Sequence, residues 1–345
     1  MLNRELVITY ANCITPLGNN GKNTADSIKN RVSKLEFSES LIDSEGNLLK
    51  ISKIKGIDKN ESRHNFLNRV SEQCLKELLK DTQIPSKVYL LMGYPALKRP
   101  GIKFDISNLV KQLKLLETEV VAEEFAQGSP SAIYGLEGAD SIIKTNPEAL
   151  CIIGTVDSLL DPLTLDWFEK DQRLNSEGSE RVNAFVPSEA VSFIVVESKK
   201  LALKNKRTIL AQITSLKTSK EPNHYVKGTP SKGQGLTTAV KSVLSHKLIP
   251  PESLTNIFFD LNGEFHRAKD WGFIRTRCFD NKKSRFSIWH PADCMGDTGA
   301  ANAGVLLSIV AQGLKQKWLD KNVLIFSSDD HGACGAVVLS ELYES

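Results

Sequence analysis

The stretch Met295-Gly296-Asp297-Thr298-Gly299-Ala300-Ala301-Asn302-Ala303-Gly304-Val305-Leu306-Leu307 decides the fold of this chain. Its glycines favour a tight turn, and Asp297 or Thr298 directly precedes a helix predicted over residues 299–314. The first turns of this helix carry small side chains, which let another backbone approach closely. We therefore place this turn and its closely packed helix at the centre of the predicted fold.

Outward from this helix, apolar strands alternate with helices along the chain. Strands are predicted at residues 6–10, 88–93, 149–154, 190–197, 209–216, 256–261, 322–326 and 334–339, and helices at 23–32, 62–80, 106–116, 131–144, 233–245 and 299–314. The pattern restarts near residue 200 without a linker. We therefore predict two α/β halves, residues 1–200 and 201–345, packed as one compact body. The polar region 37–60 is predicted as a surface excursion.

Composition indicates an ordinary globular chain of 345 residues. The 44 basic and 41 acidic residues are interspersed, which argues against a nucleic-acid partner. The six cysteines form no CxxC pair and the histidines are scattered, so neither a disulfide framework nor a metal site is predicted. No apolar run is long enough to span a membrane, and the N-terminus lacks a signal peptide. We expect a cytoplasmic protein without a cofactor, a metal or a membrane partner.

Three segments carry a family resemblance. Thr15-Pro16-Leu17-Gly18 follows the first strand, Phe185-Val186-Pro187-Ser188-Glu189-Ala190 precedes a mid-chain strand, and Gly296-Asp297-Thr298-Gly299-Ala300-Ala301 opens the last long helix. In this order, and with the βα pattern, they resemble the β-ketoacyl synthases of the thiolase-like superfamily. The resemblance covers most of the chain. It implies the five-layered αβαβα thiolase fold, an α/β fold with two βα-repeat halves, in a protein that is usually a homodimer.

The resemblance also implies a catalytic site of one cysteine and two histidines. The cysteine position falls on Ser129, with Ser131 as the alternative register, and no cysteine lies nearby. The first histidine position holds Asn262 and the second holds Asp297. Since all three catalytic residue types are replaced, the resemblance implies a chain that lacks orthodox decarboxylative condensation.

Each candidate residue has a catalytic and a structural interpretation. Ser129 is a nucleophile if a base lies nearby, and otherwise a helix N-cap before Pro130, which is the favoured interpretation. Asp297 is a proton acceptor or, by preference, a helix cap, and Asn262 is an oxyanion donor or, by preference, a turn residue. His331 is the best candidate for a base. A polar helix surface, or alternatively a pocket rim, is predicted from Glu264, His266, Arg267 and Asp270.

Two functions follow for a protein of fatty acid or polyketide biosynthesis. The first is a non-catalytic partner or acyl-binding subunit, similar to the chain-length-factor subunits that pair with an active ketosynthase. The second is an acyltransferase or thioesterase of the 3-oxoacyl-ACP synthase type that uses Ser129 on acyl-carrier or acyl-CoA thioesters. The expected assembly is a homodimer, or a heterodimer with another ketosynthase-like chain. An open acyl tunnel would be compatible with both functions, whereas a filled tunnel would leave only a scaffold role.

Overall fold

The computed structural model describes residues 5–58, 61–96, 99–101, 104–178, 180–247, 249–250, 253–279 and 285–342. Its strands are β1 (Leu6–Ile14), β2 (Glu36–Ile42), β3 (Leu48–Ile51), β4 (Lys87–Gly93), β5 (Glu119–Phe125), β6 (Cys151–Ser158), β7 (Glu189–Ser198), β8 (Ala211–Lys220), β9 (Leu254–Phe259), β10 (Ser287–Trp289), β11 (Asn322–Ser328) and β12 (Ala333–Ser340). Its α-helices are α1 (Gly21–Lys29), α2 (Arg63–Asp81), α3 (Ser107–Lys114), α4 (Ser131–Thr145), α5 (Pro162–Glu169), α6 (Lys199–Lys204), α7 (Gln234–Leu244), α8 (Phe265–Cys278), α9 (Ala292–Met295) and α10 (Asn302–Lys315). Short 3₁₀ turns lie at Tyr225–Lys227 and Gly299–Ala301.

The main sheet is built from two five-stranded halves. Its strand order is β10-β9-β11-β12-β8-β1-β7-β6-β4-β5, and the halves meet where Leu6–Ile8 of β1 pairs antiparallel with β8. In each half the first strand lies at this junction, followed outward by the fifth, fourth, second and third strands of that half. The two inner pairings are antiparallel and the two outer pairings parallel in both halves. This shared topology supports the division near residue 200, which stays a proposal.

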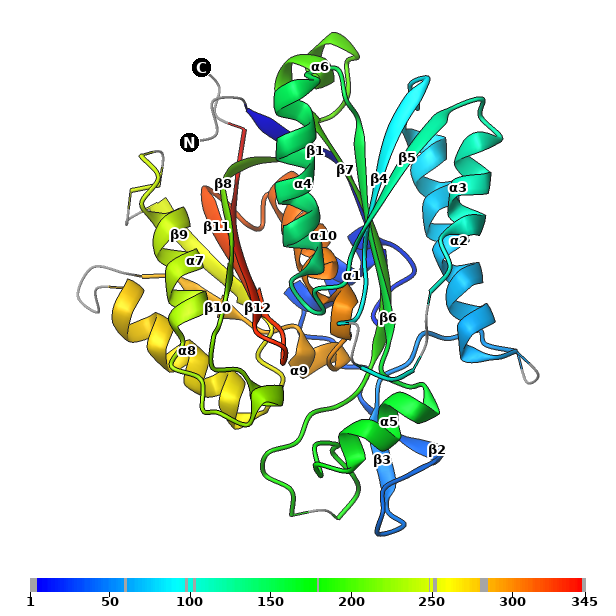
Figure 1. Cartoon of the computed structure of the whole chain (residues 1–345), viewed down its shortest axis with the longest axis vertical. Coiled ribbons are helices and arrows are strands. Elements are labelled where there is room, and N and C mark those ends of the chain that lie inside the picture. Colours follow the sequence, from blue (N-terminus) through cyan, green and yellow to red (C-terminus); the bar gives the residue numbers. More distant parts are fainter. Residues whose placement is uncertain are drawn as a thin grey trace.

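Helices form three layers around the two half-sheets (Figure 1). Helices α4 and α10 pack between the halves, where each contacts strands of both. Helix α2 covers the outer face of the first half, and α7 covers the outer face of the second half, with α8 packed against it. The five-layered αβαβα order predicted from the resemblance is confirmed.

Close packing of the central helices explains their small residues. A Cβ added at Gly135 of α4 would lie 3.0 Å from Ile153, and one added at Gly304 of α10 would lie 2.3 Å from Thr155 Oγ1. Larger side chains would push both helices off the sheet. The small-residue run that opens α10 is therefore a packing requirement, as the sequence predicts.

The predicted surface excursion at residues 37–60 is wrong in part. Strands β2 and β3 form a hairpin, and Leu49 and Ile51 bury themselves in a separate cluster with Phe168 and Phe185. Residues 59 and 60 lie outside the described residues. The polar composition of this region hid a small core that closes one end of the molecule.

No helix in the described part of the chain has the length and apolar composition that crossing a bilayer requires.

Candidate functional site

Ser129 lies at the turn between β5 and α4. It is buried, and Gly128 before it adopts φ +65°. The predicted N-capping role of Ser129 is wrong, because α4 begins after Pro130 and has no side-chain cap. Ser131 is held differently, since its hydroxyl lies 3.1 Å from the Tyr94 carbonyl oxygen and 3.0 Å from that of Phe125. The Ser129 hydroxyl has no hydrogen-bond partner among the described residues.

A cavity of about 40 Å³ lies beside Ser129. Asp297 and His331 line the same cavity, so three of the four predicted site residues converge there. Asn262 does not line it, but its Nδ2 donates a hydrogen bond of 2.7 Å to Asp297 Oδ2. The geometry therefore brings all four predicted residues into one neighbourhood.

Asp297 has a structural role at the start of the 3₁₀ turn before α10. Its Oδ1 accepts a 2.8 Å hydrogen bond from the Gly299 N–H, so the predicted capping role is confirmed. Its backbone pairs with Val186 and Ser188, which joins two of the resemblance motifs. Burial raises the pKa of Asp297, although Arg267 opposes the shift.

Asn262 forms the predicted turn after β9. Its Oδ1 accepts a 3.1 Å hydrogen bond from the Glu264 N–H, and Gly263 between them has φ +108°. Its Nδ2 donates to Glu264 Oε2 at 3.0 Å as well as to Asp297. Because both contacts of this amide are to carboxylates, it is not free to donate to an oxyanion.

Two buried arginines tie the site together. Arg173 donates to both carboxylate oxygens of Glu264, at 2.6 and 2.9 Å, and its Nη1 lies 2.7 Å from Asp330 Oδ2. Arg267 pairs with Asp260 at 3.0 Å and with Asp330 at 3.3 Å. Burial alone raises the pKa of Asp330, but Arg173, the hydrogen bond to His266 and Arg267 together outweigh it and hold that pKa well below its usual range.

A second buried ion pair contributes one of its members, Arg99, to the lining of the cavity. Arg99 donates to both oxygens of Asp157, at 2.8 and 2.5 Å, and Asp157 also accepts from the Ala300 N–H at 2.7 Å. Arg99 lines the cavity together with Phe168 and Phe185. These charged and aromatic side chains leave far less than the roughly 300–1,000 Å³ of an ordinary ligand pocket.

His331, the predicted base, is held by a neighbouring carboxylate. Its Nδ1 lies 3.0 Å from Asp329 Oδ1, while its Nε2 is buried without a partner among the described residues. Asp329 in turn packs against Gly128, where an added Cβ would lie 1.8 Å from Asp329 Oδ2. A carboxylate that orients an imidazole beside a serine is an arrangement suited to proton transfer.

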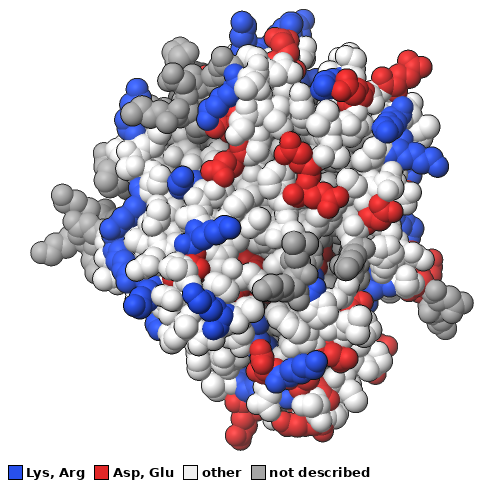
Figure 2. Space-filling view, viewed as in Figure 1, with Lys and Arg blue, Asp and Glu red and all other residues white. Residues whose placement is uncertain are grey.

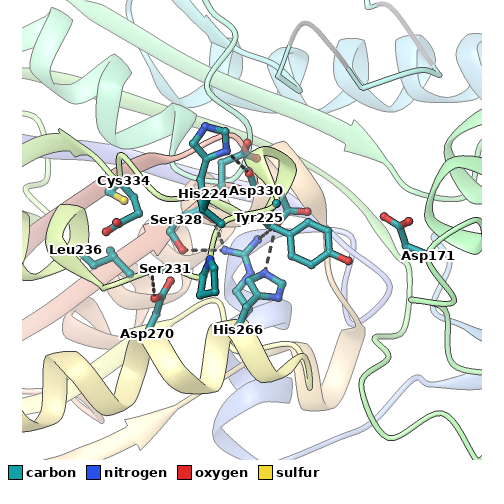
Figure 3. Close-up of a pocket in the computed structure, with 16 residues that line it drawn as sticks. Asp171, His224, Tyr225, Ser231, Leu236, His266, Asp270, Ser328, Asp330 and Cys334 are labelled. Carbon is teal, nitrogen blue, oxygen red and sulfur yellow. Dashed lines mark hydrogen bonds and ion pairs between the residues drawn. The ribbon is translucent and has the colours of Figure 1, made fainter.

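A larger cavity of about 520 Å³ adjoins the first (Figure 3). Both cavities are lined by Arg267, Asp329 and Asp330, so these side chains lie where the two cavities meet. The predicted pocket rim on α8 is confirmed for His266, Arg267 and Asp270, whereas Glu264 lies behind them in its pair with Arg173. His224 and Tyr225, from the loop before α7, also line this cavity and carry no sequence signal of their own.

Within the described residues, no group of three or more His, Cys, Asp or Glu side chains is placed to hold a metal ion. The six cysteines are free thiols.

Neither a protein-family model nor a curated protein matches the sequence. Solved structures match it over almost its whole length. An acyl-carrier protein of a type II polyketide synthase in complex with its ketosynthase includes a chain with a TM-score of 0.79 and 14% identity, over 99% of this chain and 100% of that one. The chain has the ketosynthase fold. A Streptomyces albus oxazolomycin ketosynthase domain gives 0.80 and 13% over 99% and 75% of the two chains, and the ishigamide ketosynthase/chain length factor gives 0.74 and 13% over 99% and 100%.

Proposed function

We propose that this chain is a non-catalytic, cytoplasmic subunit of the ketosynthase type, which assembles with a second ketosynthase-like chain and works with acyl-carrier protein. The observation that carries the proposal is the closed state of its site. Where the family resemblance places a cysteine and two histidines, Ser129 faces a cavity of about 40 Å³, and Asn262 and Asp297 are used as a turn and a cap.

The small volume of the cavity supports the non-catalytic role. At about 40 Å³ it is far below the roughly 300–1,000 Å³ of an ordinary ligand pocket, which leaves little room for an acyl chain. Moving Arg99 out of the cavity lining would leave the buried carboxylate of Asp157 without its cation. The ion pairs therefore favour a scaffold over an acyl tunnel.

The free edge of the main sheet supports pairing with another chain. Strand β5 pairs with β4 on one side only, and much of its surface is exposed. An open strand edge is a template for pairing with a second chain. Because the turn to Ser129 follows β5 directly, a partner seated there would lie beside the site. One similar structure is itself a ketosynthase/chain length factor, which agrees with a second ketosynthase-like chain as the partner.

A second function rests on the orientation of His331 by Asp329. In this alternative, His331 Nε2 takes the Ser129 proton as Oγ attacks a thioester carbonyl. The carbon–sulfur bond then breaks, the leaving thiolate takes the proton from His331, and the acyl group stays on Ser129 until water or an acceptor removes it. This chemistry requires the cavity to open.

Intact-protein mass spectrometry tests the proposal. The wild-type chain and Ser129→Ala are incubated with a panel of acyl-CoA and acyl-carrier thioesters. We expect no acyl adduct on either protein. An adduct on the wild type that is absent from Ser129→Ala would overturn the proposal and establish the acyltransferase alternative. An adduct on both would place the acyl group on a different nucleophile and would likewise contradict the non-catalytic role of the chain.

Sedimentation velocity tests the assembly. A purified chain that sediments as a dimer of the 38.2 kDa protomer supports a homodimer, and a monomer that dimerises only with a co-expressed ketosynthase-like chain supports a heterodimer. A chain that stays monomeric in both experiments would contradict the proposed pairing.

A further inference from the structure

A third cavity lies away from Ser129, at the other end of the central helix α10. The Ala303 N–H at the start of α10 donates a 3.2 Å hydrogen bond to the Ser129 carbonyl oxygen, whereas Lys315, the last residue of the helix, lines the cavity. The 14 residues of α10 span about 21 Å. The cavity has a volume of about 650 Å³, within the roughly 300–1,000 Å³ of an ordinary ligand pocket, and it shares no lining residue with the two cavities near Ser129.

Three separate segments of the chain bring cations to this cavity. Lys22 comes from the first turn of α1, and Lys206 and Arg207 come from the loop that joins α6 to β8. Lys315 completes the set. Blue side chains mark this end of the molecule at the top of Figure 2, where Figure 1 places α6. Cations that are far apart in the sequence therefore converge on one concave site.

Positive charge exceeds negative charge in the lining. Its two carboxylates are those of Glu77 and Asp81 in the last turns of α2. Glu77 already pairs with Lys80 at 2.6 Å, and Arg207 already pairs with Glu197 at 2.6 Å. Counted over the described residues, Asp81 is then the one lining carboxylate that remains to balance three lysines. This excess of positive charge favours an anionic ligand.

Arg207 holds one wall of the cavity in place. Its Nη1 donates a 2.6 Å hydrogen bond to Glu197 Oε2, and its Nη2 donates a 2.7 Å hydrogen bond to the Gln83 carbonyl oxygen. Glu197 is fully buried and also accepts a 2.7 Å hydrogen bond from Thr9 Oγ1. These contacts fix the loop after α6 to β7, to β1 and to the segment after α2. A wall that is already fixed lowers the ordering cost of binding.

The remaining lining suits a polar ligand rather than an acyl chain. Among the described lining residues only Ala11 and Leu210 are aliphatic, and most of the others carry hydroxyl or amide groups, as Thr82, Asn205 and Thr208 do. A lysine ammonium binds phosphate as a compact point charge. A phosphate ester with hydrogen-bonding groups of its own would use both the lysines and the polar wall.

We propose that this cavity binds a small organic phosphate, with its phosphate group among the three lysines. The site requires neither Ser129 nor a partner chain, so the proposal stands independently of the function proposed above.

Isothermal titration calorimetry at low salt tests the site on the full chain. The ligands are AMP and ribose 5-phosphate, and the comparison compounds are inorganic phosphate and adenosine. We expect both organic phosphates to bind and adenosine not to bind, because the lysines require the anion. Inorganic phosphate is expected to bind at least about threefold more weakly than AMP, because it forgoes the hydrogen bonds to the polar wall.

A lysine variant tests the position of the site. It carries Lys22→Gln, Lys206→Gln and Lys315→Gln, and it keeps Arg207 because that side chain holds the wall. We expect its affinity for AMP to fall about tenfold, because each exposed charge pair contributes modestly and three are lost.

A matched variant controls for overall charge. Lys55→Gln, Lys111→Gln and Lys241→Gln remove the same charge from exposed lysines outside the cavity. We expect this variant to bind AMP within about twofold of the wild type, because distant charges are screened. Failure of both organic phosphates to bind, binding of adenosine or inorganic phosphate as tight as that of AMP, or an equal loss in both variants would each overturn the proposal.

Discussion

Replacing Arg173 with methionine removes the cation that holds the closed site together. Arg173 is 2% exposed, and its guanidinium lies 4.9 Å from the Phe168 ring centroid and 4.3 Å from that of Tyr225. Methionine keeps much of the apolar contact and removes the charge. Glu264 then loses two hydrogen bonds, and Asp330 keeps only Arg267 and His266 as partners.

The magnitude follows from burial. Breaking a buried ion pair by removing one partner costs about 3–5 kcal/mol, because a charge stays buried without compensation. Arg69 provides a matched control, since it donates to both oxygens of Glu61 at 3.0 and 2.7 Å, but its side chain is 48% exposed. The exposed pair contributes about 0–1 kcal/mol. We therefore expect Arg173→Met to lose several times more free energy of unfolding than Arg69→Met.

Urea denaturation at neutral pH measures both variants. The double variant Arg173→Met with Glu264→Gln removes the orphaned carboxylate, so it is expected to recover part of the loss. A loss for Arg173→Met no larger than that for Arg69→Met would refute the reasoning. An unchanged double variant would show that Glu264 is not the group left uncompensated.

Three further perturbations probe the same site. Gly128→Ala adds a Cβ 1.8 Å from Asp329 Oδ2 at φ +65°, whereas the control Gly228→Ala adds one in open space at φ +70°. The melting temperature is expected to fall clearly further for Gly128→Ala, because only there does the new Cβ collide with a neighbour. Equal falls would contradict the close packing at Gly128. Burial raises the pKa of Asp297, so its stabilising contribution is present below about pH 4 and is lost as pH rises through the folded-state pKa. The free energy of unfolding of Asp297→Asn, measured in urea, is therefore expected to rise relative to that of the wild type between pH 4 and pH 8. A difference between the two proteins that does not depend on pH would refute the raised pKa. Neighbouring cations lower the pKa of Asp330 by more than burial raises it. The stabilisation from this carboxylate is therefore present above about pH 4 and is lost as the pH falls through its folded-state pKa. An Asp330→Asn variant is expected to lose less free energy of unfolding than the wild type on acidification in the same assay.

Sequence periodicity predicted the elements whose side chains are buried on one face or both. The predicted helix 62–80 corresponds to α2, which begins after the N-cap Ser62, and the strand predicted at 149–154 overlaps the fully buried β6, which begins at Cys151. Strand β5 was missed because it is an exposed edge strand with three glutamates, which leaves no apolar alternation.

The candidate site was predictable only in part. Motif spacing identified Ser129, Asp297 and His331, and these side chains line one cavity. The ion pairs that fill the site were not predictable, because Arg99 and Asp157 are 58 positions apart and Arg173 and Glu264 are 91 apart. The first pair joins two distant segments of the first half and the second pair joins the two halves, so no local pattern records either pairing.

The internal symmetry was equally hidden from the sequence. The two halves show no visible repeat, yet their strands follow one order with one pattern of parallel and antiparallel pairing. Backbone topology tolerates extensive exchange of side chains as long as apolar patterning and volume are kept. Strand connectivity, rather than residue identity, therefore carries the relationship between the halves.

The most direct test of the central claim is the intact mass of Ser129→Cys after incubation with acyl-CoA and acyl-carrier thioesters. A thiol is intrinsically far more nucleophilic than a hydroxyl, so this variant separates a lack of space from a lack of reactivity. The closed cavity predicts that the protein keeps its unmodified mass with every donor. A single acyl group that maps to residue 129 would show that the cavity admits substrate, and would contradict the non-catalytic role.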